Sequence, residues 1–254
     1  MPRPKSQRVR HRRRRSRRRR ARGTWWRRHR SRLVALAVLL ASAAVWMWRS
    51  PPPPREPTDL CAIYSERLSW YRDSRSAARR WQVPEPMLLA ILAQESSLRA
   101  DARPPRRWFL GFIPGPRPST AFGYAQVVDA TWTQFESEIG RRASRRRFSD
   151  AAQFVGWYVS ELREMLGIPA ADVDRLYLAY HEGPGGFSRG SHRGNVSLAR
   201  SAEQVARRAA RFTAQLADCR ATLDRRLLWR TLRRAAAATG VAIAVVLALW
   251  WRRR

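Results

Sequence analysis

A glutamate near the end of a short apolar segment is the residue of this chain best suited to acid–base chemistry. Apolar side chains repeat at helical spacing in residues 83–97: Met87, Leu88, Ile91 and Leu92. This spacing predicts a helix that buries one face, and Glu95 falls one turn beyond Ile91 on that face. Burial disfavours a charged carboxylate and raises its pKa, so the group can hold a proton near neutral pH. Glu95 is therefore the candidate general acid.

Two glycine-marked segments follow Glu95 along the chain. They are Gly123–Gln126 (GYAQ) and Ala179–Gly186 (AYHEGPGG). Glycines allow turns and let the backbone approach a ligand closely. Taken in order with Glu95-Ser96, the segments resemble the soluble-lytic-transglycosylase domain, a lysozyme-like family with the approximate patterns ES, GLMQ and AYNAGPG. The resemblance covers residues 83–190.

The resemblance implies cleavage of the peptidoglycan glycan strand between N-acetylmuramic acid and N-acetylglucosamine. In this family a single glutamate protonates the bridging oxygen. It then takes a proton from the muramoyl O6 as that oxygen closes on C1, which leaves a 1,6-anhydro end. The resemblance implies no cofactor and no metal, and the histidines show no ligand spacing that would indicate a zinc site.

Carried over residue by residue, the resemblance makes Glu95 the catalytic acid/base. The expected substrate-binding residues are Ser96, Gly123, Tyr124, Gln126, Tyr180, His181, Glu182 and Gly183. Three of these positions depart from the family pattern. Tyr124 stands where the family has leucine, and His181 and Glu182 stand where it has asparagine and alanine.

The altered third segment keeps two alternatives open. Glycoside hydrolases commonly use two acids, and Glu182 could serve as the second in a muramidase-type hydrolase of the same bond. The other alternative is a wall-binding scaffold that keeps the fold without catalysis. The intact Glu95 favours an enzyme.

Both ends of the chain differ in composition from its middle. Residues 1–32 contain 17 Lys or Arg and no acid, so this tail repels itself and is expected to be disordered. Residues 33–48 carry no charge and predict a transmembrane anchor. The positive-inside rule keeps the basic tail cytoplasmic and places the following domain on the periplasmic side of a bacterial inner membrane. A cleaved signal peptide is the alternative.

The domain boundaries follow from the same changes in composition. Residues 49–57 form a proline-rich linker, and residues 58–229 form the catalytic domain. Residues 235–251 are uncharged and predict a second transmembrane helix, with a buried or amphipathic helix as the alternative. Residues 252–254 are a basic tail. The basic residues are expected to contact anionic lipid, and no nucleic-acid-binding module accompanies them. The expected partners are peptidoglycan strands and the membrane.

The expected fold class is all-α, a lysozyme-like helical domain flanked by transmembrane helices, because no alternating run predicts a substantial sheet. Thr58, Asp129 and Asp150 are candidate N-caps of helices. The two cysteines, Cys61 and Cys219, bracket the domain. In an oxidising location they are expected to form a disulfide, with two buried thiols as the alternative.

The segment of residues 104–118 is longer than the family's usual link between its first two motifs. It combines prolines and glycines with five apolar side chains: Trp108, Phe109, Leu110, Phe112 and Ile113. An apolar cluster of this size is expected to be covered by another part of the protein or by a ligand. Two interpretations stay open, a cleft wall that stacks on sugar rings and a loop that packs on the core.

Overall fold

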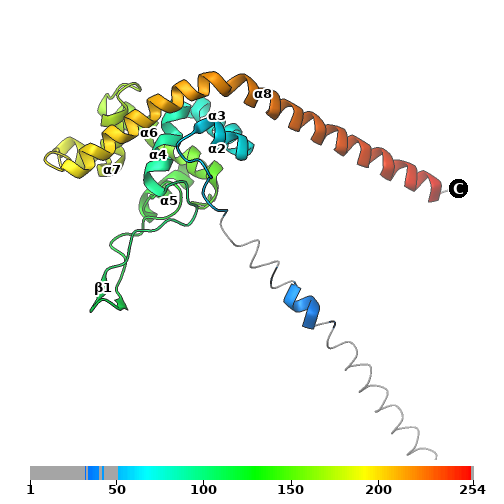
Figure 1. Cartoon of the computed structure of the whole chain (residues 1–254), viewed down its shortest axis with the longest axis horizontal. Coiled ribbons are helices and arrows are strands. Elements are labelled where there is room, and N and C mark those ends of the chain that lie inside the picture. The colour runs from blue at the N-terminus through cyan, green and yellow to red at the C-terminus, as the bar shows by residue number, and fades with distance from the viewer. Residues whose placement is uncertain (1–31, 33, 40–41, 43–50, 253–254) are drawn as a thin grey trace, which may run out of the picture. The chain divides into compact units, whose positions relative to one another are not determined.

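The computed structural model describes residues 32, 34–39, 42 and 51–252, without the side chains of residues 241–249 and 252. The chain divides into two units, residues 1–49 and residues 50–254, and the second unit contains all three motifs. This unit is predominantly helical (Figure 1). The expected helical class is confirmed.

Six helices and one long C-terminal helix build the second unit. They are α2 (Leu60–Glu66), α3 (Leu68–Trp81), α4 (Glu85–Ser96), α5 (Asp129–Glu138), α6 (Phe148–Leu166), α7 (Val173–Arg189) and α8 (Val196–Arg252). Its only described strands are β1 (Trp108–Phe109) and β2 (Ile113–Pro114), which pair as a short antiparallel hairpin.

Helix α4 lies at the centre of the helical body. It packs against α3, α6 and α8, and every residue from Met87 to Ala93 is buried. The expectation of a single buried face was therefore too narrow. Seven consecutive apolar residues place apolar side chains on every face of the helix, and such a helix is stable only when other elements enclose it. This central position fixes Glu95 at the end of α4.

The beginnings of three helices differ from the sequence-based expectation. Asp59, and not Thr58, caps α2, since its carboxylate accepts a 3.0 Å hydrogen bond from the Ala62 amide. Asp129 and Asp150 lie in the first turns of α5 and α6 and are not their caps. A carboxylate in the first turn still interacts favourably with the positive end of the helix dipole, so an aspartate there marks a helix start without capping it. The helix starts expected from these residues were therefore off by one to three positions.

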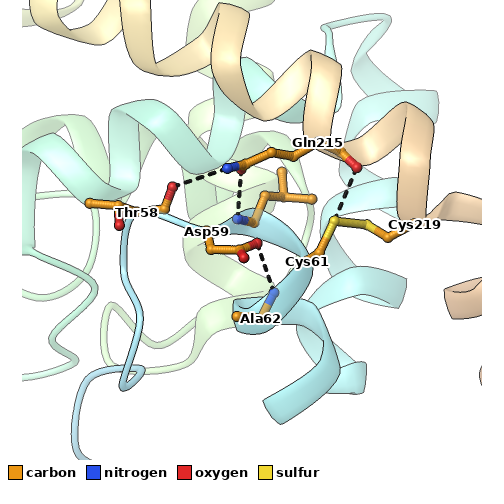
Figure 2. The surroundings of a disulfide bond; sticks show 7 residues. Thr58, Asp59, Cys61, Ala62, Gln215 and Cys219 are labelled. Carbon is orange, nitrogen blue, oxygen red and sulfur yellow. Dashed lines mark hydrogen bonds between the residues drawn. A yellow bond between two sulfur atoms is a disulfide. The ribbon is translucent and has the colours of Figure 1, made fainter.

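A disulfide joins Cys61 on α2 to Cys219 on α8, the pairing expected from the sequence (Figure 2). Gln215, one turn before Cys219, reinforces this junction. Its Oε1 accepts a 2.9 Å hydrogen bond from the Leu60 amide, and its Nε2 donates to the Thr58 carbonyl oxygen at 3.5 Å. The first and last helices of the domain are thus held together by covalent and polar contacts.

Among the side chains that the structure describes, no helix combines the length and the apolar character needed to cross a bilayer. Most of residues 33–48, expected to be the anchor, lie outside the described residues. In the second expected span, residues 235–251, the backbone continues α8, but the side chains of residues 241–249 are outside the description. Both spans stay predictions.

Candidate active site

Glu95 lies in the last turn of α4 with its carboxyl group partly enclosed. Its Oε1 is buried and has no hydrogen-bond partner among the described residues. Burial raises the Glu95 pKa to about 7, while the nearby Tyr177 hydroxyl and the charge of His181 act in the lowering direction. A carboxyl group with this pKa is protonated often enough near neutral pH to act as a general acid.

Two tyrosines of α7 lie close enough to Glu95 to interact with it electrostatically. Tyr177 and Tyr180 are three residues apart on this helix, and both are buried. Burial raises both hydroxyl pKa values, and the nearby Glu95 carboxyl raises them further. The two rings are nearly parallel, with centroids 6.5 Å apart. The glutamate therefore faces neutral hydroxyl groups.

The second and third motifs meet through one buried hydrogen bond. The Tyr180 hydroxyl donates to the Ala125 carbonyl oxygen at 2.8 Å. Gln126 stabilises the same turn, because its Nε2 donates to the carbonyl oxygens of Ala102, at 2.9 Å, and Gly123, at 2.8 Å. With Nε2 used in this way, the side-chain oxygen is the group of Gln126 left to meet a sugar hydroxyl.

A pocket of about 250 Å³ opens beside this junction. Its lining residues come from the second motif and the two residues after it, α5, α6 and the third motif: Ala125, Gln126, Val127, Val128, Thr131, Phe154, Tyr158, Tyr180, His181, Glu182 and Gly183. Glu95 is not among these lining residues, although its electrostatic partners Tyr180 and His181 are. The pocket thus adjoins the glutamate through the residues of α7.

Gly123 is held where only glycine fits. Its φ is +79°, and a Cβ atom there would lie 2.2 Å from the Arg145 carbonyl oxygen. That same oxygen accepts a 3.1 Å hydrogen bond from the Tyr124 amide. The second motif therefore rests directly on the backbone of the segment that precedes α6.

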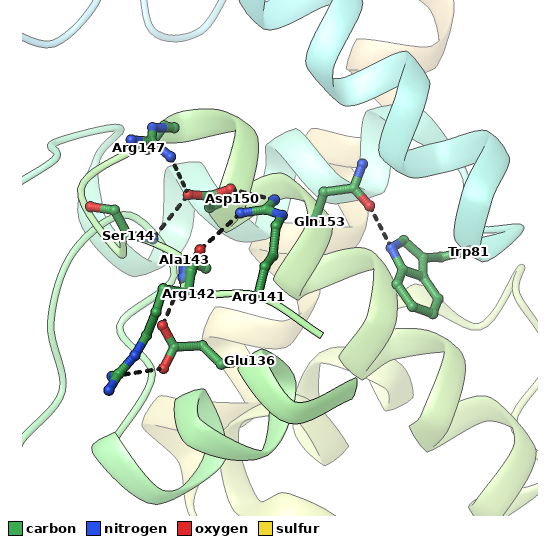
Figure 3. A network of polar contacts seen from close by, with 9 residues as sticks. All are labelled: Trp81, Glu136, Arg141, Arg142, Ala143, Ser144, Arg147, Asp150 and Gln153. Carbon is green, nitrogen blue, oxygen red and sulfur yellow. Dashed lines mark hydrogen bonds and ion pairs between the residues drawn. The ribbon is translucent and has the colours of Figure 1, made fainter. Parts of the chain in front are cut away.

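A buried carboxylate fixes that supporting segment (Figure 3). Asp150 accepts hydrogen bonds from Arg141 at 2.8 Å, from the Ser144 amide at 2.9 Å and from Arg147 at 3.1 Å. Its side chain is 2% exposed, so these partners supply the compensation that a buried charge requires. Asp150 thus acts on the second motif at a distance, through the backbone of Arg145.

A family model of the transglycosylase SLT domain matches residues 31–219. The chain belongs to the transglycosylase SLT domain family. The match includes Glu95 and both glycine-marked motifs. Membership implies a glycan-cleaving transglycosylase that acts on peptidoglycan. No curated protein matches the chain.

Within this SLT domain, three of the expected substrate-binding residues, Ser96, Gly123 and Tyr124, are not among the residues that line the pocket. Tyr124 is 1% exposed and packs edge-on against Trp70 and Phe148. Ser96 is buried, and its hydroxyl donates to the Leu92 carbonyl oxygen at 3.0 Å. The structure thus shows a packing role for Tyr124 and a hydrogen bond within its own helix for Ser96, and the sugar contacts expected for them stay predictions.

The SLT domain's altered third motif forms a small polar cluster at the edge of the pocket. Glu182 accepts a hydrogen bond from the Ser191 hydroxyl and lies 3.2 Å from Nδ1 of His181. The Ser191 hydrogen bond, assisted by His181, lowers the Glu182 pKa. Gly183, with φ +71° and ψ 165°, kinks α7 immediately after this pair. The SLT site therefore contains one carboxyl that favours its proton and one that favours its charge.

Tyr177 and Tyr158 were not among the expected site residues. Tyr177 interacts with Glu95, and Tyr158 lines the pocket and contacts Tyr180 edge-on at 5.4 Å. In the sequence, only its spacing of three residues from Tyr180 pointed to Tyr177 as a site residue. This spacing indicates a shared helix face but does not say that the face meets a glutamate.

Proposed function

We propose that this chain is a peptidoglycan lytic transglycosylase in which Glu95 is the single acid/base and the product carries a 1,6-anhydro-muramoyl end. The observation that carries the proposal is the enclosed Glu95 carboxyl, with its pKa raised to about 7. Family membership supports the substrate class.

In the proposed reaction, protonated Glu95 donates its proton to the oxygen that bridges the muramoyl and glucosaminyl sugars, and the bond from C1 to that oxygen breaks. The O6 hydroxyl of the muramoyl sugar then bonds to C1, and its proton passes to the Glu95 carboxylate. The enzyme returns to its starting state, and no water is consumed. A poorly hydrated carboxyl favours this route, because an enclosed site disfavours hydrolysis of the intermediate.

The neutral tyrosines suit the same sequence of proton transfers. When Glu95 is ionised, Tyr177 can donate a hydrogen bond to its carboxylate, and this reduces the free-energy cost of a charge on a buried carboxyl group. Tyr180 holds the Gln126 turn against α7 through Ala125. Gln126 and Tyr180 are therefore proposed to position the sugar next to Glu95.

A muramidase-type hydrolase of the same bond is the second candidate. Glu182 favours it, because an ionised carboxylate at the edge of the pocket could activate water while Glu95 supplies the proton. This division of roles between two carboxyl groups resembles that of two-acid glycosidases.

We also propose that the enzyme is tethered to the bacterial inner membrane with its catalytic domain outside. The support lies in the sequence: 17 basic residues in residues 1–32 and the uncharged residues 33–48 that follow them. Labelling of single introduced cysteines with an impermeant reagent in intact cells tests this. Labelling inside the catalytic domain without labelling in the basic tail supports the topology, and the reverse pattern contradicts it.

Mass analysis of the products from purified glycan strands tests the reaction. Anhydro-muramoyl ends would support the transglycosylase, and reducing ends would favour the hydrolase. Binding of the strands without any cleavage would indicate a wall-binding scaffold.

A further inference from the structure

The hairpin formed by β1 and β2 extends away from the helical body (Figure 1). Its two strands pair Trp108 with Pro114 and Phe109 with Ile113. At its base, the amide of Gly115 donates a 2.7 Å hydrogen bond to the Arg107 carbonyl oxygen. The segment is thus an ordered projection and not a loop folded onto the core.

The end of this hairpin exposes its apolar side chains to solvent. Leu110 is 82% exposed and Phe112 is 71% exposed, while Trp108, Phe109 and Ile113 are also exposed. The expectation that the segment packs on the core is therefore wrong. None of its residues lines the pocket beside Tyr180, so no contact supports a cleft wall either.

The turn at the tip uses a residue that its backbone disfavours. Leu110 and Gly111 both have positive φ, +52° and +77°, and the Phe112 amide donates to the Phe109 carbonyl oxygen at 3.2 Å. Two-residue turns of this type favour asparagine, aspartate or glycine at the first position. A leucine there costs roughly 1 kcal/mol in backbone strain and leaves an apolar side chain in water, so the turn geometry alone does not explain it.

The charges around the tip all have the same sign. Residues 102–128 contain four arginines and no acid. The arginines are Arg103, Arg106, Arg107 and Arg117, placed on both sides of the apolar tip. Tryptophan and phenylalanine favour the boundary between lipid headgroups and acyl chains, and arginine favours anionic headgroups.

We propose that this hairpin inserts its apolar tip into the surface of an anionic lipid bilayer, with the arginines bound to headgroup phosphates. A narrow projection with an apolar end and arginines on both sides of it fits a lipid surface. Such a surface is deformable, so the apolar side chains can enter the acyl region while the arginines stay at the headgroups. The insertion would fix the orientation of the catalytic domain at the bilayer. It is separate from the proposed cleavage reaction, which needs none of these residues.

A fluorophore at the tip tests the proposal in the full chain. Both native cysteines are in the disulfide, so Phe112→Cys provides a single site for an environment-sensitive label. The chain is reconstituted in vesicles of phosphatidylglycerol and phosphatidylcholine in about a 1:3 ratio, carrying nitroxide-labelled lipids as quenchers. We expect a blue shift and strong quenching of the label. Met165→Cys, at an exposed apolar position on α6, is the matched control and is expected to show neither.

Two further variants, made in the labelled chain, separate insertion from folding. Leu110→Asn suits the turn better than leucine does, so the hairpin is retained, and we expect at least about a tenfold lower inserted fraction. Arg107→Gln removes one charge, and we expect about a fivefold lower inserted fraction in anionic vesicles. Its effect should disappear in vesicles of phosphatidylcholine alone.

Three results would overturn the proposal. The tip label could remain unquenched in anionic vesicles, or Leu110→Asn could leave quenching unchanged. The label could also respond to added glycan strands and not to lipid, which would assign the hairpin to sugar binding. Cleavage of soluble glycan by the same variants reports on the catalytic proposal independently.

Discussion

Tyr177 on α7 and Glu95 at the end of α4 are electrostatically coupled, and each shifts the pKa of the other. The Tyr177 hydroxyl favours the ionised carboxylate and lowers the Glu95 pKa, whereas burial, the larger effect, raises it. Tyr177 therefore limits how far the Glu95 pKa rises above that of an ordinary glutamate.

The first prediction concerns this tuning. Tyr177→Phe removes the hydroxyl, so the Glu95 pKa should rise further above about 7. Since the general acid must be protonated, kcat/KM should fall with increasing pH above that pKa, and this alkaline limb should move to higher pH in the variant. The pH profile of glycan cleavage measures it. Tyr158→Phe, a change in the pocket that leaves the hydroxyl at position 177 in place, should leave the limb unmoved. A limb displaced to lower pH in Tyr177→Phe would contradict the account.

The second prediction is the effect of Glu95 on stability. At acid pH the folded and unfolded chains both hold the Glu95 proton. As pH rises from 4.5 towards about 7, the unfolded chain releases this proton first, so the free energy of unfolding falls. Glu95→Gln removes this cost and should stabilise the protein by up to about 3 kcal/mol at about pH 8. The gain should vanish near about pH 4. Urea unfolding at several pH values tests it, and a variant that is less stable at high pH would refute the raised pKa.

The third prediction separates close packing from backbone conformation in the second motif. Gly123 and Gly140 both have positive φ, but only Gly123 has a neighbour within 4 Å of an added Cβ atom. Gly140→Ala should cost about 1–2 kcal/mol from conformation alone. Gly123→Ala should cost at least about 2 kcal/mol more and reduce glycan cleavage, because Arg145 and the Gln126 turn must separate. Equal losses in the two variants, measured by chemical unfolding, would remove the packing argument.

The fourth prediction concerns the bridge between the ends of the domain. Cys61 and Cys219 are separated by 158 positions in the chain, so the disulfide restricts the unfolded chain strongly. Cys61→Ser with Cys219→Ser should lower the free energy of unfolding by about 2–5 kcal/mol. A reducing agent should destabilise the wild type to a similar degree and leave the double variant unaffected. Equal stability of both proteins without reductant would show that the bridge contributes nothing.

Local patterns in the sequence predicted the helical class, the helix that carries Glu95 and the cysteine pairing. Each depends on spacing or count along the chain, such as the apolar repeat from Met87 to Leu92. The burial of α4 on all sides could not be predicted in this way. Periodicity finds the strongest apolar stripe, but whether the remaining faces are covered depends on where α3, α6 and α8 pack.

The site itself was predicted only in part. Tyr180, Gln126 and Glu182 meet at one pocket because the turn at Gly123 is docked against α7, a tertiary contact that the three motifs implied. Tyr124 and Ser96 adjoin the same motifs, but their side chains turn into the core and into the helix. The role of Tyr177 needed the relative placement of α4 and α7, which no pattern along a single helix contains.

Cleavage of purified glycan strands by Glu95→Gln and Glu182→Gln, compared with wild type, tests the central claim that Glu95 alone transfers the proton. The account predicts anhydro-muramoyl products from wild type and a loss of about two to four orders of magnitude in their rate for Glu95→Gln. Glu182→Gln should keep the same products at a rate within about tenfold of wild type. Undiminished cleavage by Glu95→Gln would contradict the account.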